Sequence, residues 1–323
     1  NKIMIITRLT RRYSSSIRSA NETRGAFIKF FESEGHVHLP SSSVIPPATD
    51  KSLVFTNSGM NQFKDILTGV KTTRRWPSTV VTHQKCLRAG GDHNDLDNIG
   101  NDLHHLSFFE MMGNWAFNNA YGKWKACELA WTFLTEVIGI PKYRLYVTYF
   151  GGNPKWGVAA DMEMKNIWRK LGLHNSRILP FVDENFWDIG PTGICGPCTG
   201  IYYDRVEGRS NVPNLVNVDD SVVELWNIVF ANSMRNEDGS VTQQRTMHVS
   251  TSLGLERLVS VVQGVNSNFD TDLFRPIIGS IEKLSESGVR YAGRVGTEDE
   301  GGRDAAFRLI ADHVRAASVA LAE

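Results

Sequence analysis

The sequence predicts an α+β domain built around an antiparallel sheet. Segments with the two-residue period of strands and segments with the helical period follow one another irregularly, without the strand–helix–strand succession typical of parallel sheets. The chain has 323 residues, of which 41% are hydrophobic and 22% charged, so it can bury a sizeable core. Its four cysteines are too few for a disulfide scaffold, and no stretch of about 18 apolar residues is present. We therefore expect a reducing compartment and no membrane partner.

The first 20 residues differ in composition from the rest of the chain. Basic and acidic residues both total 35, so the whole chain lacks the excess of positive charge typical of a nucleic-acid coat. Residues 1–20, by contrast, are rich in arginine and serine, and no acid precedes Glu22. This composition is typical of a mitochondrial transit segment, although an irregular basic N-terminus would share it. We expect folding to begin near Asn21 and the protein to reside in the mitochondrial matrix, with the cytoplasm as the alternative.

The first half of the chain predicts one helix followed by strands and a long loop. Apolar residues at helical spacing predict a helix over residues 22–34. Short β-rich runs predict strands at 53–55 and 79–82, and a second apolar segment covers 108–117. Between them, residues 90–102 are rich in glycine, aspartate and asparagine, which favour turns. Strand, long polar loop, strand is the simplest arrangement, and a long loop inside a compact domain is often functional.

The second half mixes helices and strands without an internal repeat. Amphipathic periodicity and Gly or Pro stop signals mark the helices, and short β-rich runs mark the strands. The helices are expected at residues 123–138, 162–171, 254–262 and 303–321, and the strands at 145–150 and 224–230.

Several familiar catalytic motifs are absent from the sequence. It has no GxxxxGK[ST] or GxGxxG loop, no GxSxG elbow and no pair of histidines four residues apart. Cys195 and Cys198 have the spacing of a redox dithiol, but two thiolates alone cannot complete a zinc site. The pair lies in a turn-rich run that begins at Gly190, whereas a redox pair usually opens a helix. The alternative is a tight turn whose glycines let the backbone approach a ligand.

Three segments combine into a candidate nucleotide site. Arg88 precedes the Gly-rich loop and an aromatic residue returns at Phe109, so a guanidinium fork and a stacking ring are available together. Arg257 lies in the first turn of a predicted helix, where the N-terminus also attracts anions. The strand at 224–230 carries one amide, Asn227, among apolar residues. Each feature alone has an ordinary packing explanation, but together they fit a nucleoside triphosphate held without a P-loop.

These residues also carry a family resemblance. Arg88, the loop and Phe109 resemble motif 2 of the class II aminoacyl-tRNA synthetases, and Gly254 to Arg257 resembles their motif 3. Longer strings, from about Arg24 to the end of the chain, resemble the alanine–tRNA ligases within that class. The strings are residues 40–43 (PSSS), 55–64 (FTNSGMNQFK), 84–91 (QKCLRAGG), 93–97 (HNDLD), 108–115 (FFEMMGNW), 185–187 (NFW) and 195–198 (CGPC).

The resemblance implies a fold, a division into domains and a reaction. Residues 21–265 would form the class II catalytic domain, an antiparallel sheet flanked by helices, and residues 266–323 the truncated beginning of a helical tRNA-recognition domain. The implied reaction activates alanine with ATP to alanyl-adenylate and transfers it to tRNA(Ala). ATP would be a substrate and Mg²⁺ a cofactor, with metal ligands and oligomeric state left open.

The resemblance also implies roles for individual residues. Arg88 would hold the α-phosphate and the amino-acid carboxylate, Phe109 would stack on adenine, and Arg257 would cover the base or the γ-phosphate. His105 would belong to the same ATP site, and Gly254 would give the backbone room. The alanine pocket would be formed by Trp187, Asn227, Ser250 and Ser252.

The sequence departs from the family pattern close to the implied site. Ser250 and Ser252 stand where the family has the aspartate and glycine of an Asp-Thr-Gly run, and that aspartate binds the substrate ammonium. Other replacements are Leu106 for a second histidine, and Pro191, Ile194 and Gly200. The departures predict weakened alanine binding. They leave open a second function, a synthetase-fold paralogue that binds nucleotide or RNA with little or no aminoacylation.

Overall fold

The computed structural model describes residues 19–48, 53–70, 76–90, 93–94, 96–209, 212–285 and 288–323. The expected transit segment therefore lies outside the described residues, except for Ser19 and Ala20. Helix α2 (Ala20–Ser33) begins there with a capping box, in which the Ser19 hydroxyl accepts from the Glu22 amide and the Glu22 carboxylate accepts from the Ser19 amide. The first described helix thus begins one residue before Asn21, where folding was expected to begin.

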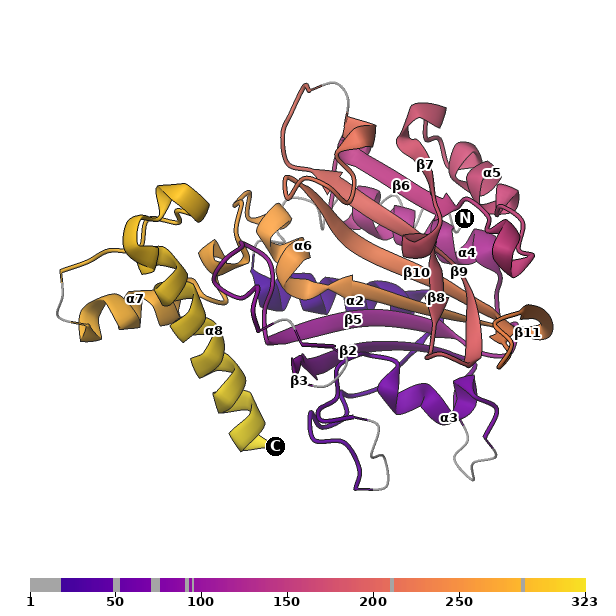
Figure 1. Cartoon of the computed structure of the whole chain (residues 1–323), viewed down its shortest axis with the longest axis horizontal. Coiled ribbons are helices and arrows are strands. Elements are labelled where there is room, and N and C mark those ends of the chain that lie inside the picture. Colours follow the sequence, from indigo (N-terminus) through magenta and orange to yellow (C-terminus); the bar gives the residue numbers. More distant parts are fainter. Residues whose placement is uncertain are drawn as a thin grey trace.

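A nine-stranded sheet organises the described chain (Figure 1). The strand order is β1-β2-β5-β11-β10-β9-β6-β7, with β8 paired to β9. Its strands are β1 (Val37–His38), β2 (Thr79–Leu87), β5 (Phe108–Ala116), β6 (Leu145–Phe150), β7 (Ile178–Phe181), β8 (Phe186–Asp188), β9 (Gly193–Asp204), β10 (Val222–Arg235) and β11 (Val241–Gly254), and a separate hairpin joins β3 (Ala89–Gly90) to β4 (His93–Asn94).

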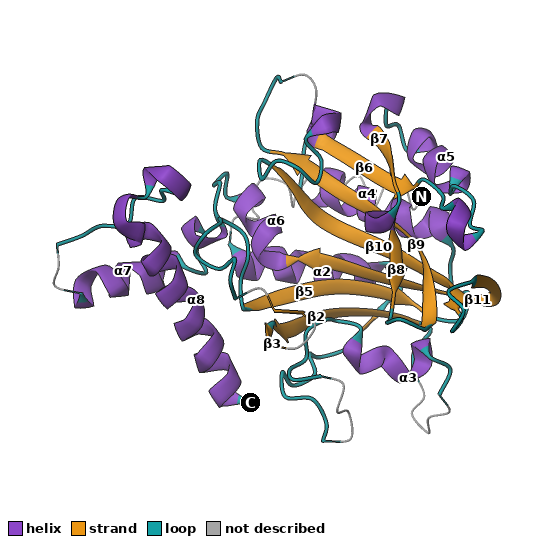
Figure 2. Ribbon diagram, in the orientation of Figure 1, coloured by secondary structure: helices purple, strands orange, loops and turns teal. Residues whose placement is uncertain are grey.

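The central strand pairs are antiparallel, which confirms the expected α+β class. Only the outer pairs β1–β2 and β6–β7 within the described sheet are parallel. Helices pack on the sheet and beyond its end (Figure 2). They are α3 (Lys64–Leu67), α4 (Lys123–Thr132), which continues as a π-helical turn over Phe133–Val137, α5 (Met162–Lys170), α6 (Leu255–Val262), α7 (Arg275–Leu284) and α8 (Arg303–Ala322).

The main core lies between the sheet and helices α2 and α4. Phe27 and Phe31 of α2 are fully buried, and the Phe27 ring meets Phe133 edge-on at 5.2 Å and Trp226 of β10 at 5.7 Å. Aromatic contacts of this kind add to the free energy gained by burying apolar surface. This face of β10 is therefore filled, and its opposite face is available for polar side chains.

The C-terminal segment forms a second apolar cluster beside the sheet. Phe269, Phe274 and Ile278 pack with Phe307 of α8, and Leu106 of the long loop joins them. In Figure 1 helices α7 and α8 lie to the left of the sheet. The domain boundary at residue 265 stays a prediction, because the cluster draws on both sides of it.

Several expectations from the sequence need correction. Residues 53–55 are not a strand but an irregular segment that Thr56 anchors through a backbone hydrogen bond to Val44. The Cys195–Cys198 run is not a turn but part of strand β9, and strand β11 and helix α7 had not been expected at all. Within the described residues, no helix is both long and apolar enough to cross a membrane.

Candidate functional site

Two adjoining cavities lie over the sheet, and the nine predicted site residues line them. The first cavity has a volume of ≈ 230 Å³ and the second of ≈ 520 Å³. The first is lined by Arg88, His105, Phe109, Asn227, Ser252, Gly254 and Arg257. The second is lined by Arg88, Trp187, Asn227, Ser250 and Ser252. The two cavities share Arg88, Met111, Glu224, Asn227 and Ser252, so these five residues mark the junction.

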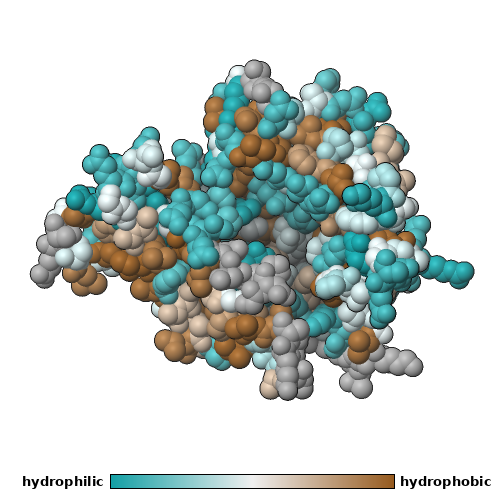
Figure 3. Space-filling model, viewed as in Figure 1, coloured by the Kyte–Doolittle hydropathy of each residue, from teal (hydrophilic) through white to brown (hydrophobic). Residues whose placement is uncertain are grey.

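Strand alternation presents the β11 residues to the cavities. Val249, Thr251 and Leu253 are buried, whereas Ser250 and Ser252 between them are half-buried and line the second cavity. Figure 3 shows hydrophilic residues across the middle of the viewed face. One sheet face thus supplies packing and the other supplies polar groups.

Arg88 lies at the end of strand β2, where it reaches both cavities. Its Nε donates to the carbonyl oxygen of Asn57 at 3.3 Å, and its guanidinium lies 5.0 Å from the centre of the Phe109 ring. The backbone amide of Arg88 donates to Ser107 at 2.7 Å, which fixes the strand end against the start of β5. The arginine and the aromatic ring predicted to act together are therefore neighbours.

The loop before β5 is organised by Asp102. One carboxylate oxygen accepts from the amides of His104 and His105 at 3.0 and 2.8 Å, and the other contacts the His105 ring. Burial works against ionisation, but the hydrogen bonds from His105 and the backbone outweigh it and lower the pKa of Asp102. Burial lowers the pKa of His104, so this imidazole is held mainly neutral beside Arg257 at neutral pH.

Glu224, which the sequence analysis did not single out, is the acid at the junction. It accepts a hydrogen bond from the Asn227 amide at 3.2 Å, and its backbone oxygen accepts from Arg257 at 3.2 Å. Burial raises the pKa of Glu224. A Cβ added at Gly200 would meet the Tyr202 ring at 2.6 Å and the Glu224 carboxylate at 3.2 Å. Because Gly200 has no side chain, the Tyr202 ring and the Glu224 carboxylate can occupy this space.

The described contacts around Gly254 do not require a glycine at this position. It ends strand β11 and caps α6, and a Cβ there would meet only the Arg257 side chain at 3.7 Å, an ordinary contact. Glycine at this position is therefore not imposed by the protein itself, and its role toward a ligand stays a prediction.

The cysteine pair does not have the features of a redox site. Both thiols are buried, and burial raises the pKa of Cys195 to about 11 and that of Cys198 to about 12. A thiol must ionise to attack a disulfide, so these thiols are inert at neutral pH. Gly196 between them is needed because a Cβ would collide with the Phe230 carbonyl of strand β10. The close approach predicted for glycine here is to a neighbouring strand, not to a ligand.

Asp102, His104 and His105 are the one group of possible metal ligands found among the described residues, with ligand atoms within 4.8 Å of one another. Two imidazoles and one carboxylate suit a transition metal better than Mg²⁺, which prefers oxygen ligands. Both oxygens of Asp102 already accept hydrogen bonds from the loop. The group therefore gives no fit to the Mg²⁺ expected from the sequence.

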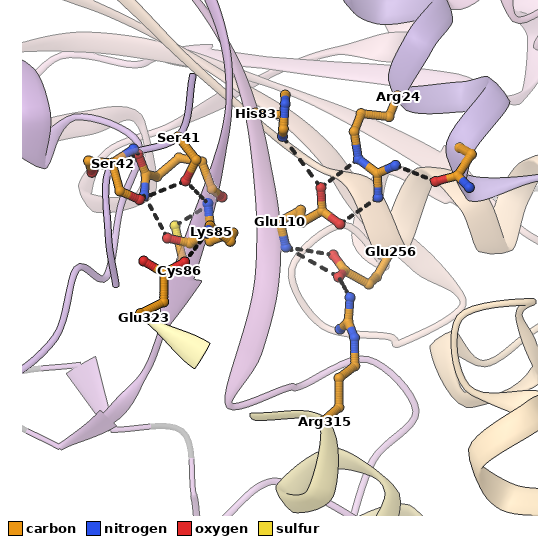
Figure 4. Close-up of polar contacts among 12 residues, drawn as sticks. Arg24, Ser41, Ser42, His83, Lys85, Cys86, Glu110, Glu256, Arg315 and Glu323 are labelled. Atoms are coloured by element: carbon orange, nitrogen blue, oxygen red, sulfur yellow. Dashed lines mark hydrogen bonds and ion pairs between the residues drawn. The ribbon is translucent and has the colours of Figure 1, made fainter. Parts of the chain in front are cut away.

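A buried polar network connects the cavity wall to helices α2 and α8 (Figure 4). Arg24 of α2 donates to both Glu110 oxygens at 2.6 and 2.5 Å, and the Glu110 amide donates to Glu256. Arg315 of α8 donates to the Glu256 carboxylate at 2.7 Å and to the Phe108 carbonyl at 3.0 Å. Charge-assisted contacts of this kind fix β5 and α6, the two elements that hold Phe109 and Arg257.

Among the residues of the first cavity to which the sequence analysis assigned no role are His104, Glu224 and Asn268. Glu224 opens a predicted strand, and an acid at the head of an apolar strand was a usable signal. Asn268 is 164 residues from His104 in the sequence yet bonds to its carbonyl oxygen, so no local pattern could have placed it there.

Comparison with known proteins agrees with this geometry. The family model for tRNA synthetases class II (A) matches residues 22–323. The mitochondrial alanine–tRNA ligase of Caenorhabditis elegans is 51% identical over 305 residues, which cover 94% of this chain and 37% of that protein. The cytoplasmic enzyme of Drosophila melanogaster is 47% identical (94% and 32% covered), and the human mitochondrial enzyme is 48% identical (94% and 30%).

Solved structures give a more distant likeness. Apo histidyl-tRNA synthetase of S. aureus has a TM-score of 0.45 and 9% identity, with 89% of this chain and 85% of that chain covered. The chain spans about a third of the length of the curated relatives it matches. By the match over nearly all of its length, the chain belongs to the class II tRNA synthetases.

Proposed function

We propose that this chain carries the catalytic centre of an alanine–tRNA ligase, which activates alanine with ATP and transfers it to tRNA(Ala). The observation that carries the proposal is the junction of the two cavities. Residues implied for ATP line the first cavity, residues implied for alanine line the second, and Arg88 and Asn227 belong to both. The similarity to alanine–tRNA ligases over 94% of the chain supports the same reaction.

In this proposal the amino-acid carboxylate attacks the α-phosphorus of ATP in line with the leaving pyrophosphate. A new carboxylate–phosphorus bond forms, the α–β phosphoanhydride bond breaks, and alanyl-adenylate and pyrophosphate result. The protein supplies positioning and charge stabilisation rather than a nucleophile. Arg88 reaches both cavities, so its planar fork can contact the carboxylate and the α-phosphate together. Phe109 and Arg257 bound the first cavity and would enclose the base.

For the Mg²⁺ that would accompany ATP, we propose ligands among the acidic side chains beside the first cavity. A third cavity of ≈ 220 Å³ shares His104, Glu224 and Arg257 with the first and adds Asp219 and Asp220. Burial raises the pKa of Glu224, and a nearby cation would favour its ionised form. When bound with ATP, Mg²⁺ would neutralise phosphate charge, and we propose that a carboxylate of this group supplies a protein ligand beside the phosphate oxygens.

The whole protein's partners follow from the same proposal. Transfer requires tRNA(Ala), and the relatives are about three times longer than this chain, so the additional length is the source we propose for most tRNA contacts. The Arg- and Ser-rich composition of residues 1–20 supports the mitochondrial form. Both mitochondrial and cytoplasmic enzymes are among the relatives.

Alanine-dependent ATP–pyrophosphate exchange tests the proposal, with serine and glycine as competing amino acids. Exchange that requires alanine supports it. ATP binding without alanine-dependent exchange would contradict it and favour the synthetase-fold paralogue. The observation behind that second candidate is Ser250, which brings no charge to the second cavity.

A further inference from the structure

A turn formed by residues 57–61 lies on the wall of the second cavity and contacts Arg88. Asn57, Ser58, Met60 and Asn61 all line this cavity. The Asn57 carbonyl oxygen accepts a hydrogen bond from Arg88 Nε at 3.3 Å. The turn is therefore a contact between the protein and the arginine on which the proposed reaction depends.

Asn61 holds the 57–61 turn through its side-chain oxygen. Its Oδ1 accepts from the backbone amide of Asn57 at 3.0 Å and from that of Ser58 at 2.8 Å. Both partners are N–H donors, so the atom that they contact is the amide oxygen and not the nitrogen. The Asn61 backbone amide also donates to the Ser58 carbonyl at 3.2 Å. The side chain and the backbone of one residue thus close the turn.

One peptide group connects Asn61 to Arg88. The Ser58 N–H and the Asn57 C=O belong to the same peptide group, which is planar and directs the two to opposite sides when it is trans. The described chain contains no cis peptide bond. Because Asn61 holds the N–H on one side, the carbonyl points to the other side, where Arg88 Nε meets it. The hydrogen bond to the N–H also polarises the peptide and strengthens its carbonyl as an acceptor.

Strand β5 holds the 57–61 turn independently of Asn61. The Gly59 amide donates to the sulfur atom of Met111 at 3.2 Å. A Cβ at Gly59 would lie 3.3 Å from the Trp115 ring, so the backbone of the turn is packed closely against the strand. Loss of the Asn61 side chain should therefore release the peptide between Asn57 and Ser58 without detaching the whole turn.

We propose that Asn61 is a positioning residue that sets the plane of the Arg88 guanidinium through the peptide between Asn57 and Ser58. The inference rests on the proposed function for the two oxygens that Arg88 contacts, one of the amino-acid carboxylate and one of the α-phosphate. A guanidinium contacts two oxygens at once only when its plane matches theirs. Without Asn61, Arg88 keeps its charge but loses this fixed orientation. The loss should appear mainly in kcat, because orientation matters most when the new bond forms.

A double-variant cycle in alanine-dependent ATP–pyrophosphate exchange tests this role. Asn61→Ala should lower kcat about 10-fold, because small displacements of a contact to the reacting groups are costly, and should change KM by about threefold at most. In the Arg88→Lys background, which has no Nε, Asn61→Ala should lower kcat by less than about twofold further, since the contact that it orients is already absent. Asn61→Asp keeps an oxygen that can accept from both amides, and it should hold kcat within about threefold of the wild type.

Gln62→Ala is a matched control for loss of an amide next to the turn. Gln62 donates to the Gln84 side-chain oxygen at 3.3 Å and lines neither the first nor the second cavity. This variant should keep the wild-type kcat, and thermal unfolding shows whether each variant is folded. Equal losses from Asn61→Ala in the wild-type and Arg88→Lys backgrounds would overturn the proposal. A loss in Asn61→Asp or in Gln62→Ala as large as that in Asn61→Ala would overturn it as well.

Hydrogen exchange at Arg88 Nε separates this inference from the proposed function. The exchange rate is measured by NMR on protein with ¹⁵N-labelled arginine, and the signal is assigned by its absence in Arg88→Lys. Exchange should be slow in the wild type and in Asn61→Asp, and faster in Asn61→Ala. Exchange in the wild type as fast as at exposed arginines would overturn the contact, even if Asn61→Ala does not fold. Slow exchange in a chain without alanine-dependent activity would support the contact and contradict alanine activation, and alanine-dependent activity with fast exchange would have the opposite meaning.

Discussion

Among the described residues, the β11 wall of the second cavity carries no carboxylate, and introducing one there should strengthen alanine binding. We predict that Ser250→Asp combined with Ser252→Gly lowers the KM for alanine. Both serines lie on the β11 wall of this cavity. A buried ammonium needs an acceptor, preferably a charged one, and a serine hydroxyl brings no charge.

The carboxylates already present do not replace the missing one. Those lining the second cavity among the described residues are Glu184, Asp188 and Glu224. Asp188 is held by Arg235 at 2.9 Å, and Glu184 is exposed. Glu224 is five residues along β10 from Val229, the strand partner of Ser250, a separation of roughly 16 Å at the usual rise per residue. Its carboxylate reaches back only as far as the Asn227 amide.

The expected gain follows from the charge that is added. A hydrogen bond to a charged group is worth about 1.5–3 kcal/mol, so KM should fall roughly 10- to 100-fold. At a separation of ~16 Å and an effective dielectric constant of about 20, repulsion from an ionised Glu224 costs about 1 kcal/mol. That corresponds to about one pKa unit, which leaves an aspartate at position 250 ionised at neutral pH.

The assay is alanine-dependent ATP–pyrophosphate exchange at several alanine concentrations. Ser250→Asn with Ser252→Gly is the matched control, because it has nearly the same shape without the charge. KM should fall only in the aspartate variant, with kcat little changed. An unchanged or higher KM would refute the reasoning and show that another group already binds the ammonium.

Further predictions concern other parts of the molecule. Arg88→Lys should lower the exchange rate about a hundredfold, or by about 3 kcal/mol, because an ammonium cannot contact two oxygens in the planar geometry of a guanidinium; a wild-type rate would contradict this role. Binding of tRNA to this chain should be weak and fall about tenfold between 50 and 200 mM salt, as expected for about two phosphate contacts; nanomolar, salt-insensitive binding in a filter assay would be inconsistent with it. Cys195→Ala should leave exchange unchanged, and a large loss would revive a thiol mechanism. Burial opposes ionisation of Glu110, but the contact with His83 at 3.7 Å and the hydrogen bonds from Arg24 lower its pKa from 4.5 to about 2. About 3 kcal/mol of stability should therefore be present above pH 4.5 and lost as the pH falls toward 2. In urea unfolding, the Glu110→Gln variant should have a lower free energy of unfolding than the wild type near pH 6, and that free energy should fall less on acidification. A variant with the wild-type pH dependence would argue against the ion pair between Arg24 and Glu110.

The helices and strands with a clear apolar periodicity could be located from the sequence alone. Helices α2, α4, α5 and α6 and strands β2, β5, β6 and β10 all lie where apolar periodicity placed them. Strand β9 was missed because Gly193, Gly196 and Pro197 resemble a turn, whereas its pairing with β10 and β6 overrides that preference. Strand β11 was missed because its first half is polar and exposed, and its pairing with β10 could not be read from its own residues.

The site shows the same contrast between residues recognised from local sequence and residues placed by long-range contacts. The nine residues assigned by the family resemblance all line the two cavities, and each belongs to a short string that can be recognised in the sequence alone. Asn268 and Glu224 depend on contacts between distant segments or neighbouring strands, and single-sequence reasoning had no access to them. The run Leu53–Phe55 shows the opposite error. Its three β-prone residues predict a strand, but they pair with no strand in the described structure.

The buried charges on helix α8 have a consequence for how small a folded fragment of this protein can be made. Arg308 donates to the Gly100 carbonyl at 2.8 Å, Asp312 accepts from the Ser107 amide at 2.9 Å, and Arg315 binds Glu256. Deleting the helix would strand the Glu256 carboxylate, 2% exposed, without its cation, a loss that typically costs about 3–5 kcal/mol. That is a large share of the total stability of an ordinary domain. The smallest independently folding unit therefore extends through α8, even though every predicted site residue lies before residue 258.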